Sequence, residues 1–84
     1  MAEENAVRTR ILGEIGRLAA ARNVEADRKA PAYEWMLRLD QALIDAGTTL
    51  NVGPIDEAEK HLKNLAAVCV AALEAYEYHA WVGV

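Results

Sequence analysis

The sequence lacks several residue types that particular protein classes require. It holds one cysteine, Cys69, and no serine or phenylalanine among its 84 residues. A single cysteine excludes a disulfide scaffold within the chain and a cysteine-rich zinc site. No serine nucleophile is available, and no glycine-rich phosphate loop is present. Because Cys69 lies in the most apolar stretch, we expect it to be buried and inert. Nucleophilic catalysis is therefore not expected.

Long hydrophobic runs are also missing. The longest uninterrupted apolar run, residues 65–73, has nine members, whereas a membrane-spanning helix needs about 20. The first residues read Met-Ala-Glu-Glu-Asn, without the basic and apolar regions of a signal peptide. We expect a cytoplasmic protein of a bacterial host, with no membrane partner.

Positive charge is scarce. Lysine and arginine number 9 against 13 acidic residues, so the net charge is −4. The imbalance lies in residues 39–84, where two basic residues face seven acidic ones. Nucleic-acid binding draws most of its affinity from cationic contacts with phosphates, so a nucleic-acid partner is not expected.

Alanine is abundant, and it determines the expected fold class. It supplies 17 residues of a chain that is 54% hydrophobic and 9.2 kDa in mass. Alanine is the best helix former but buries little area, and a chain this short buries only about 60–65% of its unfolded surface. We therefore predict one helical domain spanning residues 1–84, with a thin core.

Apolar spacing divides this domain into three predicted helices and no strand. An apolar stripe with spacings of three and four runs through residues 3–22. A polar connector follows, and Pro31 suits the first turn of a second helix over 31–46, with Gly47 as its C-cap. Gly53-Pro54 then opens a long third helix over 54–80. The predicted fold class is all-α, a three-helix antiparallel bundle with a long C-terminal helix.

The third predicted helix is apolar on all sides between Leu65 and Leu73. Such a helix is normally buried on every side, and two shorter helices cannot cover it. We therefore expect a homodimer or larger helical assembly in which these helices pack together. The aromatic C-terminal tail is a further interface candidate. The candidate interface residues are Leu65, Val68, Cys69, Ala72, Leu73, Tyr76 and Trp81.

One carboxylate interrupts the apolar pattern of the second predicted helix. On a helical wheel Asp40 falls inside the apolar arc, between residues such as Met36 and Leu43. A buried carboxylate has to be paired, hydrogen-bonded or neutralised. Asp40 is therefore either a ligand, metal or catalytic group, or one half of a buried ion pair with Arg8 or Arg22.

A second group of polar residues shares a face of the third predicted helix. Glu57, His61 and Asn64 follow at spacings of four and three, and Glu59 lies at the other edge. A glutamate and a histidine one turn apart are able to share a cation, although two ligands do not make a site; the alternative is a solvated surface pair. The candidate ligand or metal residues are Asp40, Asp45, Glu57, Glu59, His61 and Asn64.

Three segments resemble a known family. They are Ile11-Leu12-Gly13-Glu14-Ile15, then Trp35 with Leu37, Leu39 and Asp40, then residues 61–75, which read HLKNLAAVCVAALEA. Together they resemble small phage and prophage proteins of the MazG-like, all-α nucleoside triphosphate pyrophosphohydrolase type. The resemblance spans about 60 residues.

The resemblance implies a scaffold more than a catalyst. Members of that family hold Mg²⁺ with an E-x-x-E pair on one helix and an E-x-x-D pair on the next. Here Gln41 and Ile44 stand where further acids would be needed, and His61 with Asn64 takes the place of the second pair. A histidine and an amide do not supply the negative charge that Mg²⁺ requires. The resemblance thus implies a degenerate site.

Three functions follow from these observations. The first is a small non-enzymatic binding protein of a phage or mobile element, without a cofactor, that blocks a host protein such as a defence or CRISPR component, or sequesters a nucleotide. The second is a nucleoside triphosphate pyrophosphohydrolase that depends on Mg²⁺ or Mn²⁺ and has an unusual site made of Asp40, Asp45, Glu57, Glu59 and His61. The third is a structural helical dimerisation module. We favour the first function over the enzymatic one.

Overall fold

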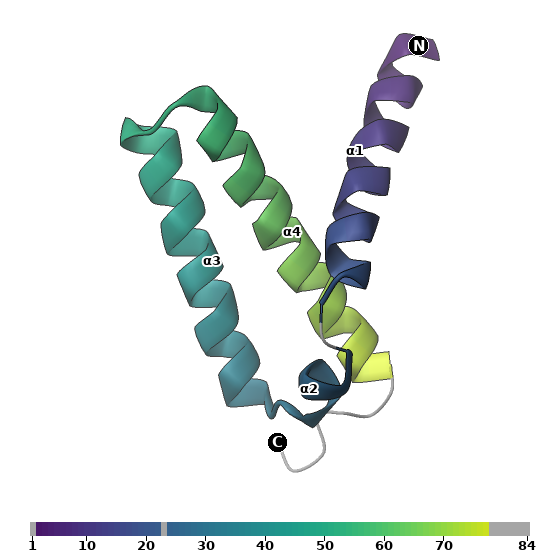
Figure 1. Ribbon diagram of the computed structural model, residues 1–84, viewed down its shortest axis with the longest axis vertical. Helices are drawn as coiled ribbons and strands as arrows, with labels where there is room; N and C mark the ends of the chain where they lie inside the picture. The colour runs from purple at the N-terminus through teal and green to yellow at the C-terminus, as the bar shows by residue number, and fades with distance from the viewer. Residues whose placement is uncertain (1, 23, 78–84) are drawn as a thin grey trace.

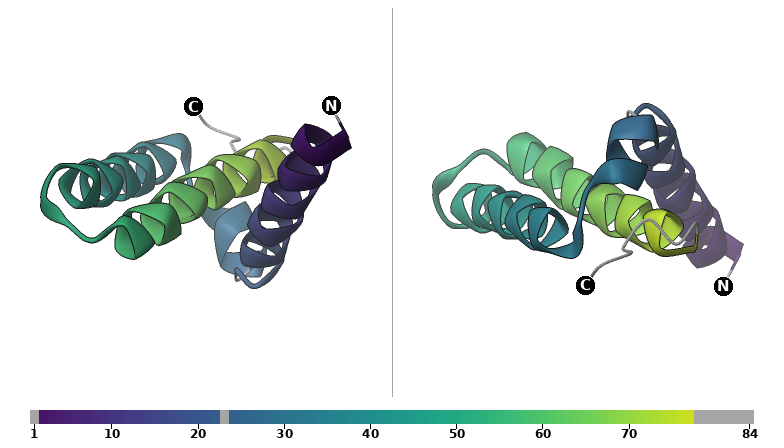
Figure 2. Two further views of the ribbon diagram at one scale, coloured as in Figure 1. Left: turned by 90° about the horizontal axis from the view of Figure 1, so that it is seen from above. Right: turned by 90° about the horizontal axis from the view of Figure 1, so that it is seen from below.

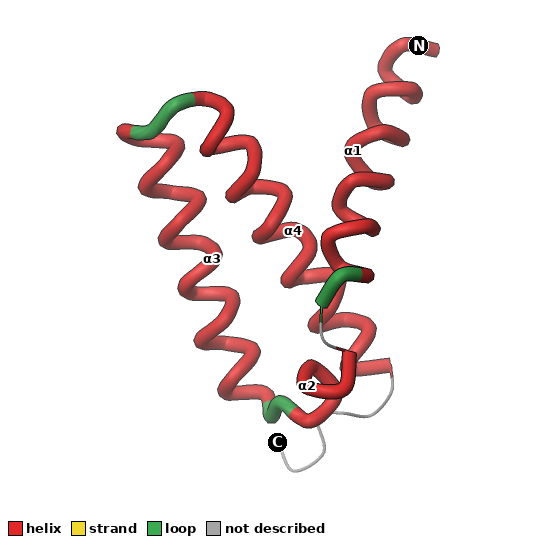
Figure 3. The backbone as a smooth tube through the Cα atoms, viewed as in Figure 1, coloured by secondary structure: helices red, strands yellow, loops and turns green. Residues whose placement is uncertain are grey.

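Four helices make up the described part of the chain. The computed structural model describes residues 2–22 and 24–77, and Figures 1 and 3 show helices and short loops, with no strand among those residues. The all-α prediction is confirmed, with four helices in place of three. None of these helices combines the length and apolar character needed to cross a bilayer. The helices are α1 (Ala2–Ala20), α2 (Val24–Lys29), α3 (Ala32–Val52) and α4 (Ile55–Glu77).

The predicted end of the second helix at Gly47 is wrong. α3 continues for six more residues to Val52. A glycine in a helix interior costs only about 1 kcal/mol relative to alanine, which packing along α4 outweighs. The hydroxyl of Thr49 donates to the carbonyl oxygens of Asp45 and Ala46, at 3.0 and 3.1 Å, so this threonine is accommodated within the helix.

Gly53 is the residue that ends α3. Its N–H donates to the carbonyl oxygen of Thr49 at 2.9 Å, while its own backbone is extended. Pro54 follows, and a proline disfavours helical geometry in the residue before it. A Cβ at position 53 would lie 3.0 Å from the Cα and the carbonyl oxygen of Thr49. The tight turn between α3 and α4 therefore requires glycine at this position.

The other predicted helix boundaries agree with the structure to different extents. The first helix, predicted over 3–22, is confirmed to within two residues, since α1 spans Ala2–Ala20. The predicted connector, residues 23–31, instead contains α2. The last helix, predicted over 54–80, is α4, and residues 78–80 lie outside the described residues together with Trp81.

α4 lies between α1 and α3 and packs against both (Figure 1). α3 runs antiparallel to α4 along most of its length, whereas α1 crosses α4 and then diverges from it, so its first half projects from the rest of the molecule. Viewed from its ends, α3 and α4 form one layer of two long helices, and α1 is inclined across the thickness of this layer at one side, with α2 near the end of α1 (Figure 2). Its shortest dimension is 19 Å, and α1 packs on α4 without packing extensively on α3. The expected three-helix bundle is thus open.

The distribution of side-chain sizes in this layer is inverted relative to an ordinary core: the buried apolar side chains are mostly small, and the large ones are exposed. Eleven apolar residues are buried among those described, and all except Trp35 and Val68 are alanines. The large apolar side chains lie outside, with fourteen of them exposed. The main cluster joins Trp35 and Ala42 of α3 to Val68 and neighbouring alanines of α4. Small side chains let α3 and α4 approach closely, but they bury little area. Since apolar burial contributes about 25 cal/mol per Å², this core contributes little stabilisation.

Candidate functional site

Asp40 is exposed, so the prediction of a buried carboxylate is wrong. The apolar arc of α3 is wider than the face that packs on α4. The packed face carries Trp35, Ala42 and Ala46, while Asp40 lies on the opposite side among exposed apolar residues. The suggested partner Arg22 is engaged elsewhere, by Asp27.

The other candidate carboxylates are held by neighbours on their own helices. Asp45 accepts a hydrogen bond from the side-chain amide of Gln41 at 2.9 Å. Glu57 pairs with Lys60 at 3.4 Å, and Glu59 with Lys63 at 2.8 Å. Glu57 is therefore paired with a lysine one turn along α4.

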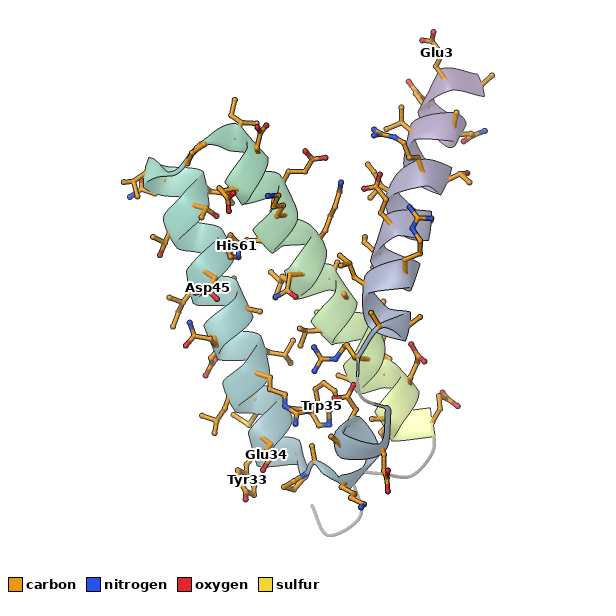
Figure 4. All side chains as sticks on the ribbon, in the orientation of Figure 1. Glu3, Tyr33, Glu34, Trp35, Asp45 and His61 are labelled. Atoms are coloured by element: carbon orange, nitrogen blue, oxygen red, sulfur yellow. The ribbon has the colours of Figure 1, made fainter. Side chains whose placement is uncertain are left out.

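The structure does not gather the candidate ligands into one group. His61 is half-buried on the side of α4 that faces α3, Asn64 is exposed, and Figure 4 shows His61 and Asp45 on separate helices. Within residues 2–22 and 24–77, no three histidine, cysteine, aspartate or glutamate side chains converge in a way that would hold a metal ion.

The candidate interface residues separate into two groups. Val68 and Ala72 are buried in the core against α3, so a partner does not reach them, and Leu65 is half-buried beside them. Leu73 and Tyr76 are exposed.

Cys69 is also exposed, against the expectation that it is buried. It lies on the strip of α4 that neither α1 nor α3 covers, and so it is accessible to a thiol reagent.

Sequence reasoning missed one buried carboxylate, Asp27. It is 8% exposed and lies in α2, between the guanidinium groups of Arg22 and Arg38. Arg22 donates to both carboxylate oxygens, at 3.0 and 3.2 Å, and Arg38 donates to one of them at 3.1 Å. These charge-assisted bonds join the end of α1, α2 and the start of α3. No sequence motif predicts that Asp27 is buried, because its pairing with Arg22 depends on how the chain turns between the two residues.

Trp35 completes this group, which we call the Asp27 cluster and define as Arg22, Asp27, Trp35 and Arg38. The indole is 2% exposed and points from α3 toward α4 (Figure 4). Both guanidinium carbons lie near its ring, Arg38 at 4.7 Å and Arg22 at 5.6 Å from the centroid, within cation–π range. Its Nε1 has no hydrogen-bond acceptor among the described residues. The cluster fixes the positions of helices.

A second ion-pair group joins α1 to α4. Lys63 of α4 contacts Glu14 of α1 as well as Glu59. The hydrogen bond from Lys63 lowers the pKa of Glu14 below its usual value. In return, hydrogen bonds to Glu14 and Glu59 raise the pKa of Lys63. Both members of the interhelical pair are therefore charged at neutral pH.

The most conspicuous surface feature is on α3, on the side away from α4. Tyr33, Leu37, Asp40 and Ile44 follow at spacings of four, three and four, so they form one stripe along the helix. The three apolar members are about 60% exposed, and Figure 4 shows Tyr33 pointing away from α4. We call this set the outer stripe.

A hollow of 410 Å³ lies where α1, α4 and the turn after α3 come together. Its apolar lining includes Ile11 of α1, Leu50 of α3, and Ile55 and Leu62 of α4. Its charged lining residues are Glu59 and Lys63, which pair with each other. The hollow is therefore suited to apolar side chains.

Comparisons with known proteins identify no relative. No protein-family model, no curated protein and no solved structure matches the chain. The function therefore has to be argued from the surfaces described above.

Proposed function

We propose that this protein is a non-catalytic helical binding module that inserts the outer stripe of α3 into a groove on a partner protein. The observation that carries this proposal is the spacing of the stripe. An amphipathic helix that binds in a groove presents its anchors at positions i, i+4, i+7 and i+11 or close variants. Tyr33, Leu37, Asp40 and Ile44 occupy those positions and are exposed.

Asp40 supplies the specificity in this proposal. A carboxylate among three apolar anchors favours a groove with an apolar floor and a lysine or arginine opposite position 40, since a charge that loses water has to be paired. A partner surface covered in this way is no longer available to other proteins. Binding would therefore block it, which is the inhibitory role expected from the sequence for a host target.

Affinity capture from a bacterial lysate, followed by binding measurements with the purified partner, tests this function. We expect Ile44→Glu and Asp40→Lys each to weaken partner binding at least about tenfold, because each removes one anchor contact. Val7→Glu, which changes an exposed apolar residue of α1, serves as the control and should bind like the wild type. Identical binding by the wild type and both stripe variants would contradict the proposal.

A second candidate function is self-association, favoured by a separate observation. The inverted side-chain sizes leave the layer with an alanine core and with fourteen large apolar side chains exposed among the described residues. Domains normally bury the apolar face of one layer against a second layer. A structural module that completes its core with another copy of itself would account for this distribution.

A further inference from the structure

Two exposed apolar stripes with seven-residue spacing lie on neighbouring helices. On α3 they are Met36, Leu43 and Leu50; on α4 they are Ile55, Leu62 and Cys69. Residues seven apart on a helix differ by only about 20° in direction, so each set forms one stripe. We call these six residues the heptad face. They are distinct from the outer stripe of α3.

Both stripes open on the same side of the layer. Leu50, Ile55 and Leu62 line the same hollow, where α3 ends and α4 begins. From this hollow the two stripes extend along antiparallel helices that lie side by side (Figures 1 and 2). The heptad face is therefore continuous across α3 and α4.

The surface area of the chain is large for its mass. The chain exposes 6217 Å², whereas a folded monomer of this mass exposes about 4,900 Å². The excess of about 1,300 Å² exceeds the roughly 800 Å² that each partner buries in a standard protein interface. The radius of gyration, 14.2 Å, is likewise larger than the roughly 12 Å expected for a compact domain of this length.

The periodicity and charge of the heptad face identify the partner. Seven-residue apolar repeats are what helices need to interlock side by side, each side chain fitting between those of the facing helix. A second copy carries the same repeats, so a twofold arrangement is self-complementary. The chain has a net charge of −4, which makes two copies repel, but none of the six positions is charged. Pairing through this face therefore brings apolar side chains together, and Glu59, the acidic residue that lines the same hollow, is paired with Lys63.

We infer that a second copy of the chain packs on the heptad face and forms a homodimer of two helical layers. This inference rests on the self-association function and adds the surface that performs it. Val68 and Ala72, expected from the sequence to contact the partner, remain inside each copy. The outer stripe points away from the interface and stays available to another protein.

Light scattering after size exclusion, between about 1 and 200 μM, is the direct test. We expect the wild type to have twice the monomer mass of 9.2 kDa. Leu43→Glu should raise the dimer dissociation constant at least about 100-fold, since each copy loses one buried leucine and gains a charge. The matched control is Ile44→Glu, because Leu43 and Ile44 are both 59% exposed and are adjacent on the same helix. This control should remain dimeric.

The single cysteine provides a second readout that does not depend on a variant. Thiol modification of Cys69 should slow as the wild-type concentration rises, and it should be fast at every concentration in Leu43→Glu. Circular dichroism establishes that both variants keep their helices. A monomer at 200 μM would overturn self-association and the heptad face together. A dimer equally stable in both variants would overturn the heptad face and leave self-association standing.

Discussion

Asp27 and Asp40 show how differently two carboxylates of one small chain are used. Asp27 is buried between two guanidinium groups and joins three helices, whereas Asp40 is exposed among apolar side chains. A helical wheel places a residue on a face, but it does not tell which face packs. The bulky residues around Asp40 suggested burial, yet α3 packs through alanines and one tryptophan.

The Asp27 cluster makes a residue-scale prediction. Asp27→Asn removes the charge that compensates Arg22 and Arg38, and hydrogen bonds to charged groups contribute about 1.5–3 kcal/mol each. We expect the free energy of unfolding to fall by about 2 kcal/mol in urea titrations.

The control for this substitution is Glu25→Gln, in the same helix. Its pair with Lys29 is exposed, and exposed pairs contribute about 0–1 kcal/mol. Equal effects of the two substitutions would contradict a structural role for the cluster.

At the scale of elements, the two glycines that flank the end of α3 have opposite roles. Nothing lies within 4 Å of a Cβ built on Gly47, whereas a Cβ on Gly53 meets the backbone of Thr49 at 3.0 Å. Gly47 is followed by two threonines, which have low helix propensity, and Gly53 is followed by a proline, so the pattern predicted the wrong glycine as the helix end.

We therefore expect Gly47→Ala to stabilise the protein by up to about 1 kcal/mol, through helix propensity. Gly53→Ala should destabilise it by about 1–2 kcal/mol, because the backbone contact has to open. Thermal unfolding followed by circular dichroism measures both variants under the same conditions. A stabilised Gly53→Ala variant would show that the turn between α3 and α4 is not tight.

Much of the fold was predictable from the sequence because it depends on local patterns. Helix content, the start of α1 and the Gly53-Pro54 turn follow from propensity and spacing. The Asp27 cluster and the open layer depend on contacts between distant residues, which periodicity does not encode. The candidate ligands failed to gather for a local reason: Asp45 and Glu57 are each held by a neighbour on their own helix.

At the scale of the whole molecule, α1 is the long helix that packs least on the others. Every residue from Ala2 to Arg10 is exposed. Its connection to α4 relies on a few half-buried apolar residues and on the Glu14–Lys63 pair.

This pair makes the attachment of α1 sensitive to acid. The pKa of Glu14 is lower in the folded protein than its usual value, so its stabilising contribution is present above the unfolded pKa, about 4.3. That contribution is lost as the pH falls through the folded value. We expect the melting temperature to drop on acidification below about pH 4.5, and to drop less in Glu14→Gln.

The control is Glu3→Gln, which removes an exposed carboxylate from the first turn of the same helix. It should retain the acid sensitivity of the wild type. Parallel pH profiles for all three proteins would show that the pair does not hold α1 in place.

The alanine core has a practical consequence for mutational mapping. A scan that replaces each residue with alanine leaves nine of the eleven buried apolar positions of the described residues unchanged, since they already hold alanine. Such a scan would report on the Asp27 cluster, Val68 and the Glu14–Lys63 pair, but not on the alanine positions of the apolar core. Its remaining signals would come mainly from the exposed side chains of α3 and α4, so they would map contacts with other molecules.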